Sequence, residues 1–193
     1  MSDPLPYRIA ALVYLFNAQG ELLLLHRRRS PNKDLFSPIG GKLEQSHGES
    51  PFQCAIRETF EEVGITLAAS ELRVCGIISE KAFEGHGHWL MFCFEALTPQ
   101  TFPARDIPEG RLEWVPPQQV PTLNIPDTDR HIIWPLMLDH SRMLCRHNAD
   151  KKGSPANAIA SEPFYAHIDC SDPKKLAVHC EYPVAKDWVV PLP

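Results

Sequence analysis

The sequence has no long hydrophobic run and no excess of positive charge. Its purely apolar runs, such as Leu22 to Leu25, fall far short of the ~20 residues that a membrane-spanning helix needs. The 19 Lys and Arg are outnumbered by 24 Asp and Glu, which gives a formal net charge of −5 and no broad basic field for duplex DNA. We therefore expect neither a membrane nor long nucleic acid as a partner. A single nucleotide stays compatible with this charge, because a metal ion can neutralise its phosphates.

Paired-cysteine motifs and an export signal are also missing. The first four residues contain Asp3 where a secretory signal would have basic residues. The six cysteines show no C-x-x-C pair, so we expect reduced, buried thiols and a cytoplasmic protein. They are Cys54, Cys75, Cys93, Cys145, Cys170 and Cys180.

The length and composition indicate one folded domain with an appendage. The chain has 193 residues, of which 44% are hydrophobic and 22% charged, and this balance excludes intrinsic disorder. Polar and turn-forming residues follow Cys145. We therefore predict a domain over residues 1–145, a linker over 146–162, and a C-terminal β-hairpin and tail over 163–193.

Alternating and amphipathic patterns predict the elements of the domain. Residues 8–16 and 22–27 are β-prone and are joined by a short Gly-containing turn, which predicts an opening β-hairpin. Strands are expected over 72–80, 88–97 and 113–115. The second is apolar on both faces and is therefore central in a covered sheet. A second amphipathic helix is expected over 129–144.

The first helix has clear start and stop signals. Ser50 is an N-cap, Pro51 suits the first turn, and Gln53 completes a capping box. Gly64 fits the left-handed position just past a helix end, so the helix should run from Pro51 to Val63.

Three carboxylates lie on one side of this helix. At about 100° per residue, Glu58, Glu61 and Glu62 oppose an apolar face made of Phe52, Ile56, Phe60 and Val63. Like charges at this spacing repel, so basic neighbours or a divalent cation should offset them. Clustered hard oxygen ligands suit Mg²⁺ or Mn²⁺. The alternative is a solvated acidic face.

The loop and the helix together resemble a known motif. The segments GGKLE at 40–44, GES at 48–50 and RETFEEVGI at 57–65 resemble the Nudix box, G-x5-E-x7-R-E-U-x-E-E-x-G-U with U aliphatic. Thr59 replaces an aliphatic residue, and seven residues instead of five separate Gly41 from Glu49. The surrounding order of elements is similar to the family fold out to Leu144.

This resemblance implies a fold and a reaction. The fold is an α/β class Nudix-type α/β/α sandwich, with a mixed sheet between helices and the C-terminal β-hairpin as an extension. The reaction is metal-dependent pyrophosphohydrolysis of a nucleoside diphosphate linked to another group. By position, Glu58, Glu61 and Glu62 would bind Mg²⁺ or Mn²⁺ together with the Gly40 carbonyl.

The resemblance also implies catalytic roles. Arg57 would hold Glu49 and orient the site. Glu58 would assist the attacking water, with Glu61 beside it, or a later loop acid would take that part. The best candidate for such an acid is Glu84, ahead of Glu109 and Glu113, and a solvated turn residue is its alternative.

The substrate is less defined. Residues 113–135 look like the region that meets the base in Nudix enzymes acting on oxidised purine nucleoside triphosphates, so Asp127 and Asp129 are candidates for base recognition. Their alternative role is to cap the second helix. Phe36 could stack on a base and Lys42 could reach phosphates. Other hypotheses are an ADP-ribose or dinucleoside polyphosphate hydrolase, and a non-catalytic nucleotide sensor.

The C-terminal hairpin alternates apolar and polar residues. A loop over residues 171–175 would place Ile168 opposite Val178, Phe164 opposite Tyr182, and His167 opposite His179. All the apolar side chains then share one face. Two strands alone are marginal in water, so that face should pack on the domain or on a second subunit in a homodimer.

Overall fold

The computed structural model describes residues 5–29, 32–145, 147 and 162–192, and its strands form two sheets. The larger sheet has seven strands in the order β11-β10-β9-β5-β6-β1-β4, and the smaller has four in the order β3-β2-β8-β7. The strands are β1 (Tyr7–Tyr14), β2 (Leu22–Arg27), β3 (Phe36–Ser37), β4 (Ile39–Lys42), β5 (Leu72–Phe83), β6 (Gly87–Ala96), β7 (Arg105–Ile107), β8 (Gly110–Val115), β9 (Phe164–Asp169), β10 (Lys175–Tyr182) and β11 (Lys186–Pro191).

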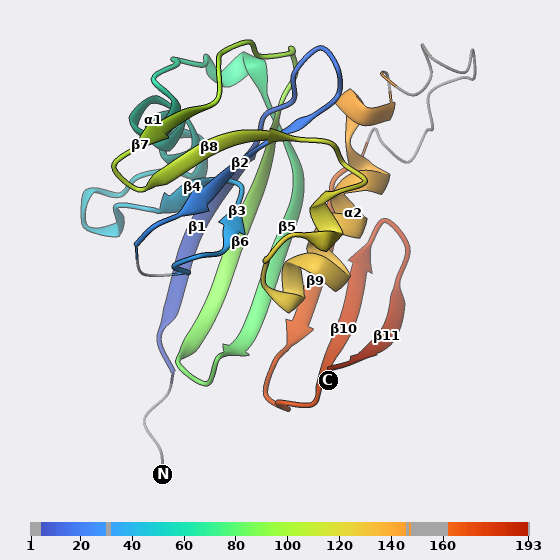
Figure 1. Cartoon of the computed structure of the whole chain (residues 1–193). Helices are drawn as coiled ribbons and strands as arrows, with labels where there is room; N and C mark the ends of the chain where they lie inside the picture. Colours follow the sequence, from blue (N-terminus) through green and yellow to red (C-terminus); the bar gives the residue numbers. More distant parts are fainter. Residues whose placement is uncertain (1–4, 30–31, 146, 148–161, 193) are drawn as a thin grey trace.

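Helices cover both faces of the larger sheet (Figure 1). Its β1–β6 and β5–β9 pairs are parallel and the remaining pairs antiparallel. On β1, Ala10 belongs to a core shared with α2 (Trp134–His140), whereas Ala11 belongs to a second core shared with α1 (Pro51–Val63). This alternation follows from the two-residue period of a strand. The predicted α/β/α sandwich with a mixed sheet is confirmed.

The predicted opening hairpin is present only at its turn. The strands β1 and β2 meet only where the hairpin turns, at an isolated bridge between Phe16 and Leu22, and then enter different sheets. Leu22 and Leu24 face the core on the α2 side, while Leu23 and Leu25 face the core on the α1 side. The strand β2 is therefore apolar on both faces and lies between the two cores. It pairs with β8 instead of β1.

The ends of α1 are confirmed, but its faces are not. Ser50 and Gln53 form the capping box, and Gly64 ends the helix with a φ of 77°. Phe60, expected in the apolar face, is 57% exposed, whereas Glu62 is 7% exposed. Glu58 and Glu62 turn inward against the backbone of β4, whereas Glu61 stays exposed. Thr59 is buried, and its hydroxyl donates to the Ala55 carbonyl at 2.7 Å, so the core accepts it in an aliphatic position.

The strand β6 is central, between β5 and β1, as predicted. The second helix differs from the expected span of 129–144. It opens with a π-helical turn (Asp129–Ile133), continues as α2, and is interrupted at Ser141, which has extended backbone. Buried Glu95 causes this break, because its carboxylate accepts hydrogen bonds from the backbone N–H groups of Arg142 and Met143, both at 3.1 Å.

The C-terminal segment extends the larger sheet. Val178 pairs with Ile168 and His179 with His167, as predicted, but a bulge between Cys180 and Tyr182 places Tyr182 opposite Tyr165 instead of Phe164. The expected tail forms a third strand, β11, and β9 pairs in parallel with β5. The three-part division of the chain stays a prediction about folding units. Most of its linker, residues 146–162, lies outside the described residues.

The apolar face of these strands packs on the chain's own core. Phe164 and Ile168 are fully buried there, beside residues of α2. The hairpin therefore gives no exposed apolar face to support the predicted homodimer, which stays a prediction.

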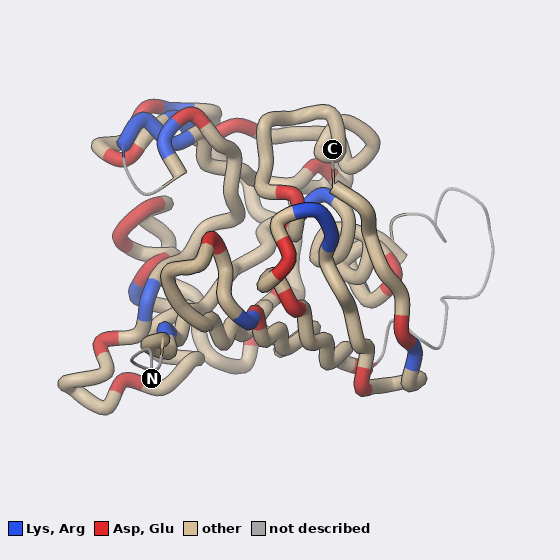
Figure 2. Tube along the Cα trace, turned by 90° about the horizontal axis from the view of Figure 1, so that it is seen from below, with Lys and Arg blue, Asp and Glu red and all other residues tan. Residues whose placement is uncertain are grey.

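In the described part of the chain, no helix is long and apolar enough to cross a membrane. Residues of both charge signs are interspersed along the trace (Figure 2).

Candidate active site

Two glycines of β4 bring its backbone against α1. The Gly40 N–H donates to Glu62 Oε2 at 3.1 Å. A Cβ at Gly41 would lie 2.2 Å from Glu58 Oε1, so this glycine leaves room for the Glu58 carboxylate. Gly40 has a φ of 140°, and a Cβ there would lie 2.1 Å from the Ala11 carbonyl oxygen. The backbone at Gly40 therefore requires glycine, whereas a side chain at Gly41 would displace only the Glu58 carboxylate.

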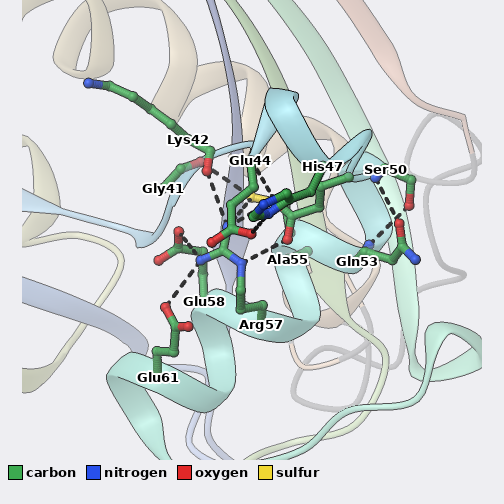
Figure 3. A network of polar contacts seen from close by, with 12 residues as sticks. Gly41, Lys42, Glu44, His47, Ser50, Gln53, Ala55, Arg57, Glu58 and Glu61 are labelled. Atoms are coloured by element: carbon green, nitrogen blue, oxygen red, sulfur yellow. Dashed lines mark hydrogen bonds and ion pairs between the residues drawn. The ribbon is translucent and has the colours of Figure 1, made fainter.

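Arg57 organises the acids around it (Figure 3). Its Nε and Nη2 donate to the two oxygens of Glu49 at 2.7 and 2.9 Å, a bidentate pair. Its Nη1 donates to Glu58 at 2.8 Å and to Glu61 at 3.1 Å. The Glu49 side chain is only 9% exposed, so this arginine fixes a nearly buried carboxylate. The expected Arg57–Glu49 contact is present in the structure.

The two extra residues before Glu49 form a local turn. Residues Gln45–His47 make one turn of 3-10 helix, and Gly48 closes it with a left-handed backbone. Glu49 then points back and accepts the Glu44 N–H at 2.7 Å. The loop thus absorbs the longer spacing without displacing Glu49 from Arg57.

Burial raises the pKa of two of these acids, and hydrogen bonds lower the pKa of a third. Burial raises the pKa of Glu62 to about 7, and the charge of Glu58 adds to the effect. The pKa of Glu58 is raised mainly by burial, against the opposing effect of Arg57. The hydrogen bonds from Arg57 lower the pKa of Glu49. Glu49 therefore stays ionised, whereas Glu62 can take up a proton near neutral pH.

The donor set fits a hard divalent cation. Glu58 and Glu62 repel each other, and a cation would remove that repulsion. Among residues 5–29, 32–145, 147 and 162–192, no three acidic, His or Cys side chains are arranged to hold a metal ion. The geometry explains this, because Arg57 draws Glu58 and Glu61 toward itself. That Glu58, Glu61 and Glu62 bind Mg²⁺ or Mn²⁺ together with the Gly40 carbonyl stays a prediction.

A small pocket of about 20 Å³ lies next to β3 and the start of the π-helical turn. Aromatic and apolar residues make most of its wall, and the lining includes the polar side chains of Asp129, Ser37 and Trp134. The Ser37 hydroxyl and the Trp134 indole nitrogen are buried without a hydrogen-bond partner in the described part of the chain. The full lining is Tyr14, Leu22, Leu24, Phe36, Ser37, Pro38, Val120, Ile125, Asp129 and Trp134.

The predicted substrate residues divide between this pocket and the surface. Phe36 and Asp129 line the pocket, and Phe36 stacks on His26 with ring centroids 4.3 Å apart. Asp127 is exposed and lies 3.9 Å from Arg130. Lys42 is exposed, with Nζ 5.8 Å from the centre of the Trp89 ring. Neither aspartate caps the helix, because Thr128 is the N-cap and makes no capping side-chain bond.

Glu84 lies apart from the acids of α1. It is exposed in the turn between β5 and β6, which Figure 1 shows at the end of the sheet away from α1. Its backbone has a φ of 50°. The structure therefore does not bring Glu84 together with Glu58, and its role as the extra acid stays a prediction.

The sequence reading missed Glu80 and Thr128. Glu80 on β5 is 3% exposed, and its pKa is raised to about 8 by burial and by the charge of Asp129. The signal was present, since Glu80 follows Ile78 by two residues and therefore shares its inward face. An acid at an inward strand position needs a partner or a function.

Comparisons with known proteins identify the family of the chain. A family model described as NUDIX domain matches residues 6–134, about two thirds of the chain. A protein of Bacillus subtilis (strain 168) named "Putative 8-oxo-dGTP diphosphatase" is 29% identical over 126 residues, which are 65% of this chain and 78% of that protein.

Two solved structures illustrate the likeness of fold. The MutT protein from Bacillus halodurans has a TM-score of 0.62 at 22% identity, covering 90% of this chain and 97% of that one. The NUDIX domain of Shewanella oneidensis NrtR, complexed with ADP ribose, has a TM-score of 0.55 at 16% identity, covering 70% of this chain and 87% of that one. At these identities the likeness shows the fold alone.

Proposed function

The chain belongs to the NUDIX domain family and is a hydrolase of phosphoric anhydride bonds, and on this premise we propose that it cleaves a purine nucleoside triphosphate, including oxidised forms, to the monophosphate and pyrophosphate. Water adds to the phosphorus next to the nucleoside, and the bond from that phosphorus to the bridging oxygen breaks. The observation that carries the proposal is the Arg57–Glu49–Glu58 network beside the glycines of β4.

The acids and Arg57 have distinct parts in this proposal. Glu58 takes a proton from the attacking water, because burial raises the pKa of its carboxylate toward the range useful for a base. Arg57 holds Glu49 with two hydrogen bonds and Glu58 with one. Glu62 is fixed by the Gly40 N–H. A bound Mg²⁺ or Mn²⁺ supplies charge neutralisation of the phosphates and of the leaving oxygen.

Phe36 and Asp129 line the same small pocket and are the proposed contacts of the purine base. A flat ring can stack against the exposed part of Phe36, and Asp129 can accept from an N–H of its edge. The named activity of the Bacillus subtilis relative is in line with such a substrate. The cytoplasm, where nucleotides are made and thiols stay reduced, is the proposed location. Lys42, exposed at the end of β4, is proposed to reach the phosphates.

A release assay over a nucleotide library tests the proposal. Each nucleotide is incubated with Mg²⁺ or Mn²⁺, and monophosphate, pyrophosphate and orthophosphate are separated by chromatography. Monophosphate and pyrophosphate from a purine triphosphate are expected, and Glu58→Gln should remove both. Glu181→Gln is the matched control, because Glu181 is exposed on β10.

The same library separates the other hypotheses. ADP-ribose and dinucleoside polyphosphates are included, since turnover of either in place of the triphosphates would favour that activity. Orthophosphate alone from a triphosphate contradicts the proposed bond cleavage. Binding of a nucleotide without any turnover would favour a sensor.

A further inference from the structure

A row of polar side chains crosses the C-terminal part of the larger sheet. Ser79 on β5 lies opposite His167 on β9. His167 lies opposite His179 on β10, and His179 lies opposite Asp187 on β11. The row therefore runs straight across four neighbouring strands. It lies on the face away from α2, because the next residue of β9, Ile168, belongs to the core shared with α2.

This row lies apart from the acids of α1. The strands β5, β6 and β1 separate β9 from β4, whose glycines meet those acids. Figure 1 shows β9 and β10 on the side of the molecule away from α1. The side chain of His179 is 49% exposed, so an ion in solution can reach it. The proposed hydrolysis uses none of the four side chains of the row.

Each of the two histidines is held at Nδ1 by the strand on its outer side. The Ser79 hydroxyl oxygen is 2.7 Å from His167 Nδ1, so this edge of the ring faces β5. His179 Nδ1 hydrogen-bonds the carboxylate of Asp187, so this edge faces β11. In an imidazole ring, Nε2 lies at the tip on the side opposite Nδ1. Both Nε2 atoms are therefore directed outward and toward the gap between β9 and β10.

The same hydrogen bonds leave a lone pair on Nε2. An ionised carboxylate can only accept, so Nδ1 of His179 carries the hydrogen and Nε2 of the neutral ring is free to bind a metal. The Ser79 hydroxyl can donate or accept, and it therefore permits the same tautomer in His167. Neither Nε2 has a hydrogen-bond partner in the described part of the chain. A carboxylate or other polar partner on the far nitrogen is the usual support of a metal-bound histidine.

Two imidazole nitrogens suit a borderline ion such as Zn²⁺ better than the hard ion Mg²⁺. Directly opposite residues of an antiparallel pair have Cβ atoms about 5 Å apart, so both rings can reach one ion. Among the described residues, no group of three or more His, Cys, Asp or Glu could hold a metal ion, so water would complete the coordination. Lys81, on the same face of β5, is neutralised by Asp169 at 2.7 Å.

We propose that His167 and His179 form a zinc site which joins β9 to β10, and that Asp187 and Ser79 are positioning residues which orient the two rings. The site is independent of the proposed function and separate from the acids of α1. The ion binds only when β9 and β10 are paired, so it stabilises the strands that cover the core beside α2.

Titration of the full chain with Zn²⁺, followed by NMR of the histidine ring nitrogens, tests this proposal. The titration is done at pH 7.5 with reduced cysteines and an excess of Mg²⁺, which competes for the acids of α1. The Nε2 signals of His167 and His179 should shift together and saturate at one ion per chain. Zn²⁺ should also raise the thermal midpoint, and Mg²⁺ alone should shift neither signal.

Substitutions separate the ligands from the positioning residues. His167→Gln and His179→Gln each remove one ligand and should weaken Zn²⁺ binding at least tenfold and abolish the rise in thermal midpoint. Asp187→Ala should weaken binding by about 10–100-fold, because it releases the ring of His179. Asp187→Asn should restore part of that loss, because its amide oxygen can still accept from Nδ1. His86→Gln is the matched control, since His86 is exposed in the β5–β6 turn.

Four results would overturn the zinc site. The first is that neither Nε2 signal shifts at millimolar Zn²⁺, which includes uptake of the ion by cysteines alone. The second is that His86→Gln weakens binding as much as His167→Gln does. The third is that Asp187→Ala binds Zn²⁺ as tightly as the wild type, and the fourth is that Asp187→Asn restores nothing. Release of pyrophosphate that depends on Glu58 would still support the proposed function in all four cases.

Discussion

Replacing Glu62 by glutamine should abolish turnover and stabilise the folded protein. Glu62 is 7% exposed and carries its charge beside that of Glu58. Glutamine has nearly the same shape, and its side-chain oxygen can still accept the Gly40 N–H. The substitution therefore removes a buried charge and a proposed metal ligand while it keeps the packing.

The magnitude follows from the pKa of Glu62. Its folded-state pKa of about 7 exceeds the ordinary value of 4.5, so folding favours the protonated form. The carboxylate costs no stability below about pH 4.5, and the cost grows until the pH exceeds the folded pKa. Above pH 8 it reaches ~3 kcal/mol. Glu62→Gln should thus be near neutral at pH 4.5 and stabilising by up to ~3 kcal/mol at pH 8.

Urea unfolding in EDTA at both pH values measures this difference, and triphosphate hydrolysis with Mg²⁺ measures turnover. Glu181→Gln, at an exposed position on β10, is expected to change neither. Added Mg²⁺ should raise the stability of the wild type more than that of Glu62→Gln. The reasoning is refuted if the variant is destabilised equally at pH 4.5 and pH 8, or if turnover stays within a few-fold of the wild type.

Four further outcomes follow from the same structure. Arg57→Lys loses the bidentate contact with Glu49 and should lower kcat/KM at least tenfold in the hydrolysis assay, whereas an unchanged value would show that the contact is only structural. Gly41→Ala should fold but lose turnover, because it displaces the Glu58 side chain, while Gly40→Ala should lower the thermal midpoint, because its Cβ meets the Ala11 backbone. Asp129→Asn should change the preference among purine triphosphates by about 1–3 kcal/mol, and exposed Asp127→Asn should not, so equal losses for all bases would contradict base recognition. Removing the residues after 148 exposes the core that Phe164 and Ile168 cover, so the cooperative transition seen by circular dichroism should disappear, and a truncated chain with the full-length midpoint would contradict that view.

Local signals predicted local structure well. The bounds of α1 followed from Ser50, Gln53 and Gly64, because caps act through hydrogen bonds within a few residues. The register of β9 and β10 followed from alternation, except at the bulge near Tyr182. Helix spacing grouped Glu58, Glu61 and Glu62, and the resemblance to the Nudix box implied the pairing of Arg57 with Glu49.

Long-range pairing could not be predicted in the same way. Sequence patterns did not predict that β2 pairs with β8, or that β9 pairs with β5. These pairings depend on which apolar faces remain uncovered after the other strands have paired. The inward turn of Glu62 was missed for a related reason. Periodicity separates the two faces of a helix, but only the approach of the β4 backbone decides which face is inside.

The parallel pairing of β9 with β5 has a consequence for how the chain is made. During synthesis on the ribosome, β5 and β6 emerge long before β9, because each residue of β5 pairs with a residue 88 positions later. Until then the β5 edge and the apolar surface beside α2 stay uncovered. An unpaired edge next to uncovered apolar surface is prone to aggregate. The nascent chain is thus expected to need a holding chaperone until β9 to β11 have left the exit tunnel, and to reach its native state only after that point.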